Sequence, residues 1–172
     1  MIYWIVIVLV LAILALLILA AMKPNTFSVV REAEINAPPA RVHQLINDFH
    51  EWTAWSPWEK MDPNLVRTYS GTASGPGAVY EWTGNKKVGQ GRMDITGSTP
   101  SRIDIDLHFM KPFEARNKTV FTLTPQNGGT RVRWEMTGSS PFMFKVMSLF
   151  TSMDNMIGKD FESGLNTMKS VA

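Results

Sequence analysis

The segment INAPPARVHQLINDFHEWTAWSPW, residues 35–58, marks the point at which one type of sequence pattern gives way to another. The pair Pro38-Pro39 ends an extended stretch, and proline is well tolerated in the first turn of a helix. Residues Arg41–Phe49 then place apolar side chains three and four positions apart, which predicts a short amphipathic helix. The Trp-rich stretch Trp52–Trp58 predicts a second short helix, closed by its proline.

Strand-like patterns lie on both sides of this segment. Before it, Phe27–Asn36 alternates, with Val29, Ala33 and Ile35 on one face and acidic residues on the other. After it, period two returns from Leu65 onward, interrupted by clusters of Gly, Pro and Asn that are typical of turns. Six further strands are predicted, at Val66–Ser70, Ala78–Thr83, Val88–Thr96, Arg102–Met110, Ala115–Thr124 and Thr130–Thr137.

A long helix is predicted after the last strand. From Pro141 to about Ser170, apolar residues recur every three or four positions and form one continuous stripe. The short links between successive strands favour antiparallel pairing. The order therefore predicts an α+β domain in which a curved antiparallel seven-stranded sheet grips the C-terminal helix. A cavity between sheet and helix is where a ligand would bind.

Three stretches resemble the START-like helix-grip (SRPBCC) superfamily, in its polyketide cyclase/dehydrase and lipid-transfer branch. Residues 35–58 are similar to the entry motif of these proteins, Gly128–Gly138 to their last hairpin arm, and Met153–Lys169 to the end of their grip helix. His43 stands where the resemblance leads us to expect a bulky aromatic residue. The resemblance implies a cavity for lipids, sterols, polyketides or other apolar molecules, and only some members of the superfamily are enzymes.

The N-terminus carries a run of a different kind. Ile2–Met22 is unbroken by any charge, Pro or Gly, and as a helix it would be about 30 Å long, enough to cross the hydrocarbon core of a bilayer. We interpret residues 1–23 as a transmembrane anchor, residues 24–26 as a short linker and residues 27–172 as the helix-grip domain. A cleaved signal peptide is the alternative, although its usual charged start and clear cleavage pattern are missing.

The side of the membrane on which the domain lies is indicated only by flanking charge. Lys23, Arg31 and Arg41 follow the span, and the α-amino group alone precedes it. The positive-inside rule therefore leans toward a cytoplasmic domain, although several of these charges belong to the folded domain.

Composition excludes several classes of function. The chain has no cysteine, which excludes disulfides, thiolate metal sites and Cys nucleophiles. Its net charge is only +2 and no block of Lys or Arg occurs, so no nucleic-acid partner is expected. The histidines His43, His50 and His108 have no metal-ligand spacing, and we expect neither a metal nor a cofactor.

Acidic residues offer weak candidates for catalysis, and we assign no catalytic residue. Asp104 and Asp106 share a strand face, but it is opposite the apolar side chains of that strand and is expected to be solvated. Glu81 alternates with Tyr80 and Trp82, so either face of its strand could be inward. A buried carboxylate could act as an acid or base, which makes Glu81 the first residue to check.

The predicted cavity is mainly apolar. Asn117 and Thr119 belong to the same alternation as Phe121, so their side chains are predicted to point inward. They either orient a ligand or reach solvent at a strand end. The predicted cavity residues are Trp55, Trp82, Met93, Ile105, Phe109, Asn117, Thr119, Phe121, Trp134, Met153 and Ile157.

Three functions are compatible with these patterns. The first is a membrane-tethered domain that binds a lipid or another apolar small molecule. The second is a cyclase- or dehydratase-type enzyme, a lyase or isomerase, that uses acid/base residues in the cavity. The third is a ligand-free, membrane-anchored interaction module. No feature of the sequence indicates a particular protein partner.

Overall fold

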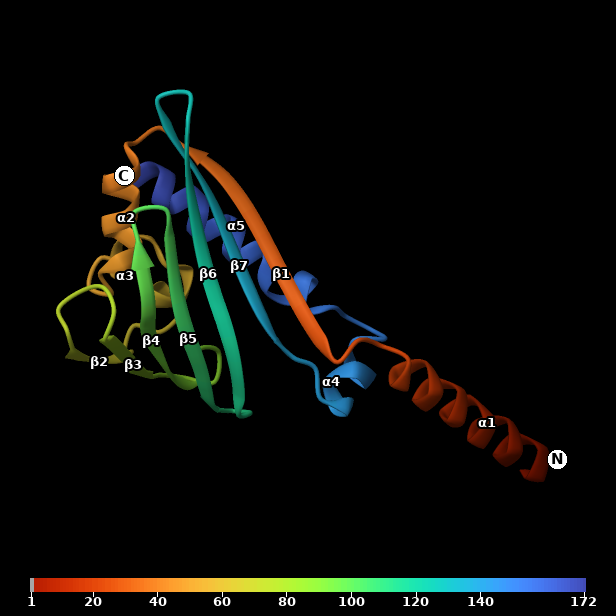
Figure 1. Ribbon diagram of the computed structural model, residues 1–172. Helices are drawn as coiled ribbons and strands as arrows, with labels where there is room; N and C mark the ends of the chain where they lie inside the picture. The colour runs from red at the N-terminus through yellow and green to blue at the C-terminus, as the bar shows by residue number, and fades with distance from the viewer. Residues whose placement is uncertain (1) are drawn as a thin grey trace.

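The computed structural model describes residues 2–172, and its central feature is a seven-stranded antiparallel sheet in the order β1-β7-β6-β5-β4-β3-β2 (Figure 1). The strands are β1 (Thr26–Ile35), β2 (Val66–Gly71), β3 (Ala78–Thr83), β4 (Gln90–Thr99), β5 (Arg102–Lys111), β6 (Ala115–Gln126) and β7 (Gly129–Ser139). The helices are α1 (Ile2–Ala21), α2 (Pro39–Asn47), α3 (Trp52–Trp55), the 3-10 helix η1 (Pro57–Lys60), α4 (Phe142–Met147) and α5 (Met153–Val171). The predicted fold class is confirmed.

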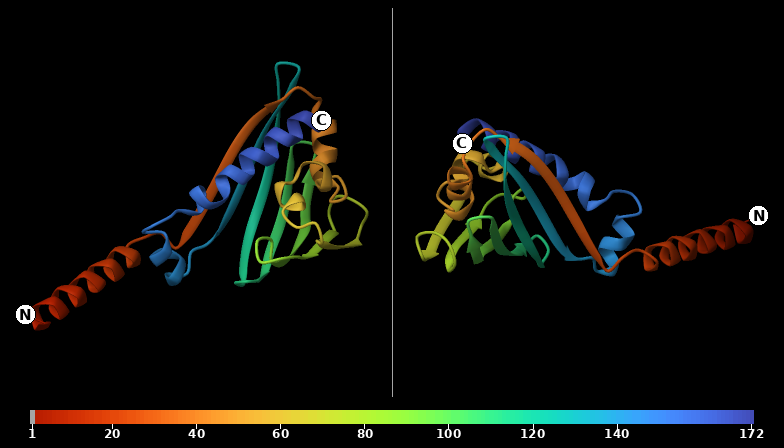
Figure 2. Two further views of the ribbon diagram at one scale, coloured as in Figure 1. Left: turned by 180° about the vertical axis from the view of Figure 1, so that it is seen from behind. Right: turned by 45° about the horizontal axis from the view of Figure 1, so that its top comes forward.

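The sheet is open and curved, and α5 crosses one of its faces (Figure 2). Strands β1 and β7 pair over ten residues, from Thr26 opposite Ser139 to Ile35 opposite Thr130. The pairing places the first strand beside the last, although α2, α3 and η1 separate β1 from the other strands in the sequence. The two short helices and α5 therefore cover the same face.

The covered face carries the apolar core. Alternate residues along each strand point toward α5, as the period-two pattern predicts. Close packing of α5 depends on a glycine, because a Cβ at Gly164 would lie 3.1 Å from Trp134 Cζ3 and 3.1 Å from Pro57 Cδ. Core side chains from the sheet include Ile95, Ile103, Ile105, Phe121, Leu123, Val132 and Trp134.

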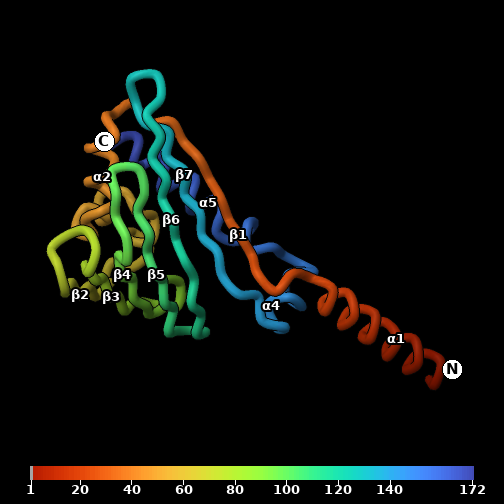
Figure 3. Tube along the Cα trace, in the orientation of Figure 1, coloured from red at the N-terminus to blue at the C-terminus, as the bar shows by residue number. Residues whose placement is uncertain are grey.

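The C-terminal helix differs from its prediction. The expected single helix from Pro141 to Ser170 is two helices, α4 and α5, separated by residues 148–152 (Figure 3). The Ser148 hydroxyl donates to the carbonyl of Lys145, and the Ser152 hydroxyl accepts from the backbone N–H of Asn155 as the N-cap of α5. These local hydrogen bonds compete with helix continuation, so the chain turns between the two helices.

Helix α1 extends away from the domain (Figure 1). It contacts α4 near its C-terminal end, and among its residues only Ala20 is buried. By length and composition α1 could cross a membrane, a property that it would share with a signal sequence.

Candidate functional site

Between the sheet, η1 and α5 lies a hollow of about 240 Å³, which we call the inner cavity. Its walls come from α3, η1, β3, β4, β5, β6, β7 and α5, so it occupies the position that the helix-grip arrangement predicts. The lining is mostly aromatic and aliphatic, and it includes Trp58, Tyr80, Trp82, Met93, Leu107 and Phe161.

A second hollow, the outer pocket, lies where α1 joins the domain and measures about 420 Å³. Residues Lys23 and Pro24 after α1, the β5–β6 turn, α4 and the start of α5 line it. Phe109, Met136 and Ile157 line both hollows, so the two share a wall. The hollows therefore form a series from the α1 end of the domain toward its centre.

Exposed apolar side chains surround the outer pocket. Phe113 in the β5–β6 turn is 69% exposed, and Phe150 between α4 and α5 is 77% exposed. Side chains of this size are normally buried, and a group of them on one surface usually marks an interaction site. We call this group the apolar rim; its members are Phe113, Phe142, Met143, Met147, Phe150 and Met156.

The inner cavity also contains a buried carboxylate. Glu59 in η1 is 9% exposed; its Oε1 accepts a 2.5 Å hydrogen bond from the Tyr80 hydroxyl, and its Oε2 accepts one of 2.5 Å from Arg67 Nε. Arg67 also donates to the carbonyls of Glu59 and Leu65. Three elements, η1, β2 and β3, thus meet at one ion pair in the cavity wall.

The electrostatics of this cluster favour hydrogen bonding over proton transfer. Burial, together with the hydrogen bond to Glu59, raises the pKa of the Tyr80 hydroxyl well above its ordinary value, so Tyr80 remains a donor at neutral pH. The Glu59 carboxylate raises the pKa of Arg67, which therefore stays charged. Because each oxygen of Glu59 already accepts one hydrogen bond, the carboxylate is held in place.

The predicted cavity residues separate into three groups. Trp82, Met93, Phe109, Thr119, Trp134 and Ile157 line the inner cavity. Asn117 and Met153 line the outer pocket, as do Phe109 and Ile157. Trp55, Ile105 and Phe121 line neither hollow and pack in the core instead.

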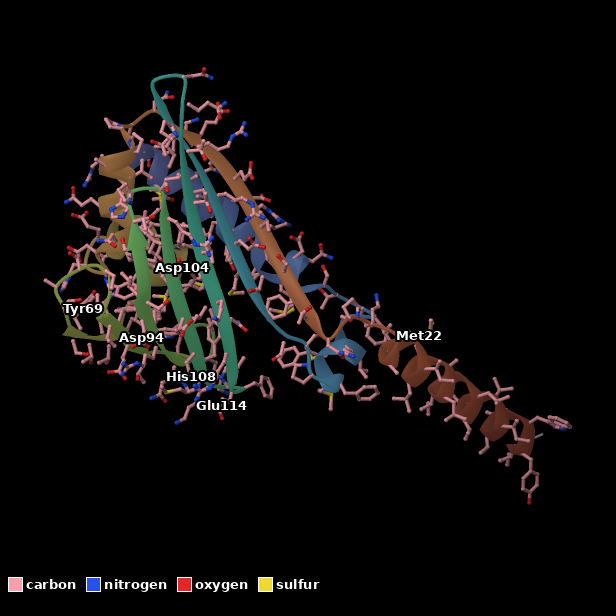
Figure 4. The ribbon with its side chains drawn as sticks, in the orientation of Figure 1. Met22, Tyr69, Asp94, Asp104, His108 and Glu114 are labelled. Atoms are coloured by element: carbon pink, nitrogen blue, oxygen red, sulfur yellow. The ribbon has the colours of Figure 1, made fainter. Side chains whose placement is uncertain are left out.

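The acidic candidates lie on the opposite face of the sheet. Glu81 is half-exposed, and its Oε1 lies 3.6 Å from Arg92 Nη1. Asp104 pairs with Arg102 on the same outer face, and His108 lies beside Glu114 with 3.0 Å between Nε2 and Oε1 (Figure 4). These residues therefore do not face the cavity.

Sequence reasoning missed Glu59, the acid that does face the cavity. It lies in a four-residue 3-10 helix, which is too short to show a periodic pattern. The nearest signal was its position directly after Trp58 in a stretch that packs against the sheet. Within residues 2–172, no group of three or more His, Asp or Glu side chains is placed to hold a metal ion.

Comparison with known proteins identifies the domain that contains these hollows. Residues 26–172 match the model of the family described as polyketide cyclase / dehydrase and lipid transport. The chain belongs to this family. Its helix-grip domain is thus of a ligand-binding type, in agreement with the inner cavity between sheet and helix.

Solved structures with the same fold share little sequence with this polyketide cyclase/dehydrase and lipid transport domain. Protein CV1439 from Chromobacterium violaceum is 17% identical, with 87% of this chain and 97% of that chain covered and a TM-score of 0.60. Ms6760 from Mycobacterium smegmatis is 22% identical, with 84% and 89% covered and a TM-score of 0.58. MLL2253 from Mesorhizobium loti is 17% identical, with 84% and 96% covered and a TM-score of 0.59. No curated protein matches the chain.

Proposed function

We propose that the chain is a membrane-tethered domain that takes a lipid or another apolar small molecule from the adjacent bilayer into its cavity. In this proposal residues 1–23 anchor the chain, residues 24–26 link it, and residues 27–172 bind the ligand. The observation that carries the proposal is the outer pocket, which lies beside the end of α1 and shares a wall with the inner cavity.

The position of the pocket supports exchange with a bilayer. A helix such as α1, once in a membrane, would bring Lys23 and Pro24 to the membrane surface, and both residues line the outer pocket. An apolar ligand could then pass from the bilayer to the pocket with little exposure to water, which would otherwise oppose its transfer.

The surface around the pocket supports the same arrangement. The apolar rim would be unfavourable in water but stable among lipid headgroups and acyl chains, where Phe and Met side chains can insert. Lys23 and Lys111, which also line the pocket, could pair with anionic headgroups. The basic residues after α1 favour a domain on the cytoplasmic side.

Acid/base chemistry is the second candidate, and the observation that favours it is Glu59 in the cavity wall. A cyclase or dehydratase needs an ionisable group beside its substrate. Catalysis by Glu59 would require the carboxylate to leave Arg67 or Tyr80. We therefore place binding before catalysis.

Native mass spectrometry of the full chain, extracted in detergent, tests the proposal. We expect bound lipid in the wild-type protein and a marked loss of it in Met136→Trp. Met136 lines both hollows, so the larger side chain would take up ligand space in them. Thr137→Trp is the matched control, since the next residue of β7 points to the outer face and should leave the bound lipid unchanged. A wild-type chain without bound lipid, or equal loss in both variants, would contradict the proposal.

A further inference from the structure

Helix α4 has the reverse polarity of a helix on the surface of a soluble domain. Its one charged side chain, Lys145, is 8% exposed, whereas Phe142 is 50% and Met143 is 69% exposed. A surface helix in water normally buries its apolar stripe and exposes its charges. The outer side of α4 is therefore suited to an apolar phase.

The buried charge of α4 has its partner inside the protein. Lys145 Nζ donates to Asn25 Oδ1 at 2.5 Å, and the backbone N–H of Ser140 donates to the carbonyl of Asn25 at 2.7 Å. These bonds tie α4 to the connection that follows α1. Lys145 is also the only charged residue between Glu135 and Asp154. Because it is buried, the segment exposes an uncharged surface.

The apolar surface continues beyond the end of α4. Phe150, in the connection between α4 and α5, is 77% exposed. Phe142, Met143 and Phe150 line neither the inner cavity nor the outer pocket, so a ligand in these hollows would not cover them. An exposed apolar group of this size indicates a further partner for this surface.

The position of α4 identifies that partner. Among the helices and strands, α4 packs mainly against α1, and Ala20 near the end of α1 is fully buried. The ribbon views show α4 beside the end of α1, at the side of the domain from which α1 extends (Figures 1 and 2). A bilayer crossed by α1 would therefore have its interface at the level of α4. Interfacial helices bury their apolar face about 5–10 Å into the boundary between headgroups and acyl chains.

We propose that α4 and residues 148–152 form a second membrane-binding element, which lies along the bilayer interface and inserts Phe142, Met143 and Phe150 among the acyl chains. This rests on the membrane attachment in the proposed function and adds to it the element that sets the orientation of the domain on the lipid surface. Because α4 also supplies Met147 to the outer pocket, one wall of that pocket then lies at the interface.

Fluorescent labels on single cysteines test the proposal, because the chain has no cysteine of its own. Met143→Cys and Phe150→Cys carry the label on the proposed element, in the full chain in nanodiscs. Val66→Cys is the matched control, since Val66 is an apolar residue of β2 that is also exposed. Leu11→Cys, near the middle of α1, reports the bilayer core. Each label is quenched by iodide in water, or by lipids with a spin label near the glycerol end or near the methyl end of the acyl chain.

The labels at residues 143 and 150 should be several-fold less accessible to iodide than the label at residue 66. They should also be quenched more strongly by the spin label near the glycerol end, as expected for a shallow position. The label at residue 11 should show the opposite preference, because it lies near the middle of the span. The label at residue 66 should be quenched by iodide and by neither lipid.

A charge on the inserted face gives an independent readout. Met143→Glu should release the element from the bilayer, because a carboxylate is unfavourable among acyl chains, and the label at residue 150 should become accessible to iodide. Val66→Glu should leave that label shielded. Both substituted side chains are exposed, so neither change removes a core contact.

The possible failures are distinguishable. Labels at residues 143 and 150 that were as accessible to iodide as the one at residue 66 would overturn the proposal and leave lipid binding in the cavity intact. Labels shielded from iodide but quenched by neither lipid would also overturn it, because a second copy or another protein would then cover the surface. A label at residue 150 that stayed shielded in Met143→Glu would count against insertion of α4. An iodide-accessible label at residue 11 would remove the membrane attachment, and the proposed function would fall with it.

Discussion

At the scale of single residues, Glu59 links the stability of the domain to its cavity. The carboxylate joins η1 to β2 through Arg67 and to β3 through Tyr80, and η1 and β3 border the hollow space. A cavity lowers stability because its lining lacks packing partners. Hydrogen bonds across the cavity wall are one way in which the domain compensates for that loss.

Substitution of Glu59 by Gln is expected to destabilise the domain. The amide would leave Arg67 without its charged partner and weaken the bond from Tyr80, and we expect a loss of about 2 kcal/mol in the free energy of unfolding, less than for a fully buried pair because Arg67 is partly exposed. Chemical denaturation of the full chain in nanodiscs, followed by Trp fluorescence, measures it. Glu81→Gln is the matched control, since the exposed Glu81–Arg92 pair should be worth at most about 0.5 kcal/mol. Equal losses in the two variants would contradict the role given to Glu59.

At the scale of elements, Arg31 fastens α5 to β1. Asp154, Gly158 and Glu162 are spaced by four residues and share one face of α5. Arg31 Nη1 lies 2.7 Å from Asp154 Oδ1, and Arg31 Nε lies 2.6 Å from Glu162 Oε1. A Cβ at Gly158 would lie 2.1 Å from Arg31 Nη2, so the glycine makes room for the guanidinium.

This contact predicts a pH dependence. The Arg31 hydrogen bond lowers the pKa of Asp154 below its ordinary value, so the contribution of Asp154 to stability is present above that value and is lost as the pH falls through the lowered one. Asp154→Asn should therefore be less stable than wild type at pH 7, and the difference should shrink as the pH falls below the ordinary pKa of an aspartate. Thermal unfolding at several pH values measures the effect.

The control for this prediction is Asp104→Asn. Asp104 also pairs with an arginine, but Arg102 belongs to the same strand and the pair joins no two elements. We expect a smaller change at pH 7 there. A difference for Asp154→Asn that did not depend on pH would show that the ion pair is not its cause.

The sequence predicts best the elements in which apolar side chains recur at a regular interval along the whole element. Strands such as β5 and β6 bury every second side chain, so their faces follow from the pattern alone. The break between α4 and α5 was missed because Val146, Phe150 and Met153 keep a helical spacing across it, while hydrogen bonds of Ser148 and Ser152 end each helix locally.

The site was less predictable than the fold, for a related reason. The alternation of side chains along a strand distinguishes residues that point inward from residues that point outward. It does not distinguish inward residues that line a hollow from inward residues that fill the core. Phe121 and Trp134 face inward as neighbours across β6 and β7, yet only Trp134 borders the inner cavity. That difference depends on how α3, η1 and α5 pack over the sheet, which local pattern does not determine.

At the scale of the whole molecule, the short connection between α1 and the domain determines where the outer pocket lies relative to α1. Only residues 22–25 separate α1 from β1, and Lys145 Nζ donates to Asn25 Oδ1 at 2.5 Å, which ties this connection to α4. The β6–β7 turn lies at the far end of the sheet from α1 (Figure 1). If α1 spans a bilayer, this geometry keeps the pocket and the apolar rim at its surface.

Lengthening that connection should slow exchange with the bilayer without changing the cavity. We expect a flexible 20-residue Gly/Ser insertion between Lys23 and Pro24 to lower the rate at which deuterated lipid from a nanodisc replaces bound lipid, as followed by native mass spectrometry, because a flexible linker of that length reaches about 25 Å and no longer orients the pocket. The amount of lipid bound at equilibrium should stay the same, since the cavity walls are untouched. The same insertion between Asn127 and Gly128, where a Cβ at Gly128 would meet no other atom within 4 Å, should alter neither quantity. An unchanged exchange rate after the first insertion would mean that the apolar rim alone holds the pocket at the membrane, or that the ligand reaches the pocket through water.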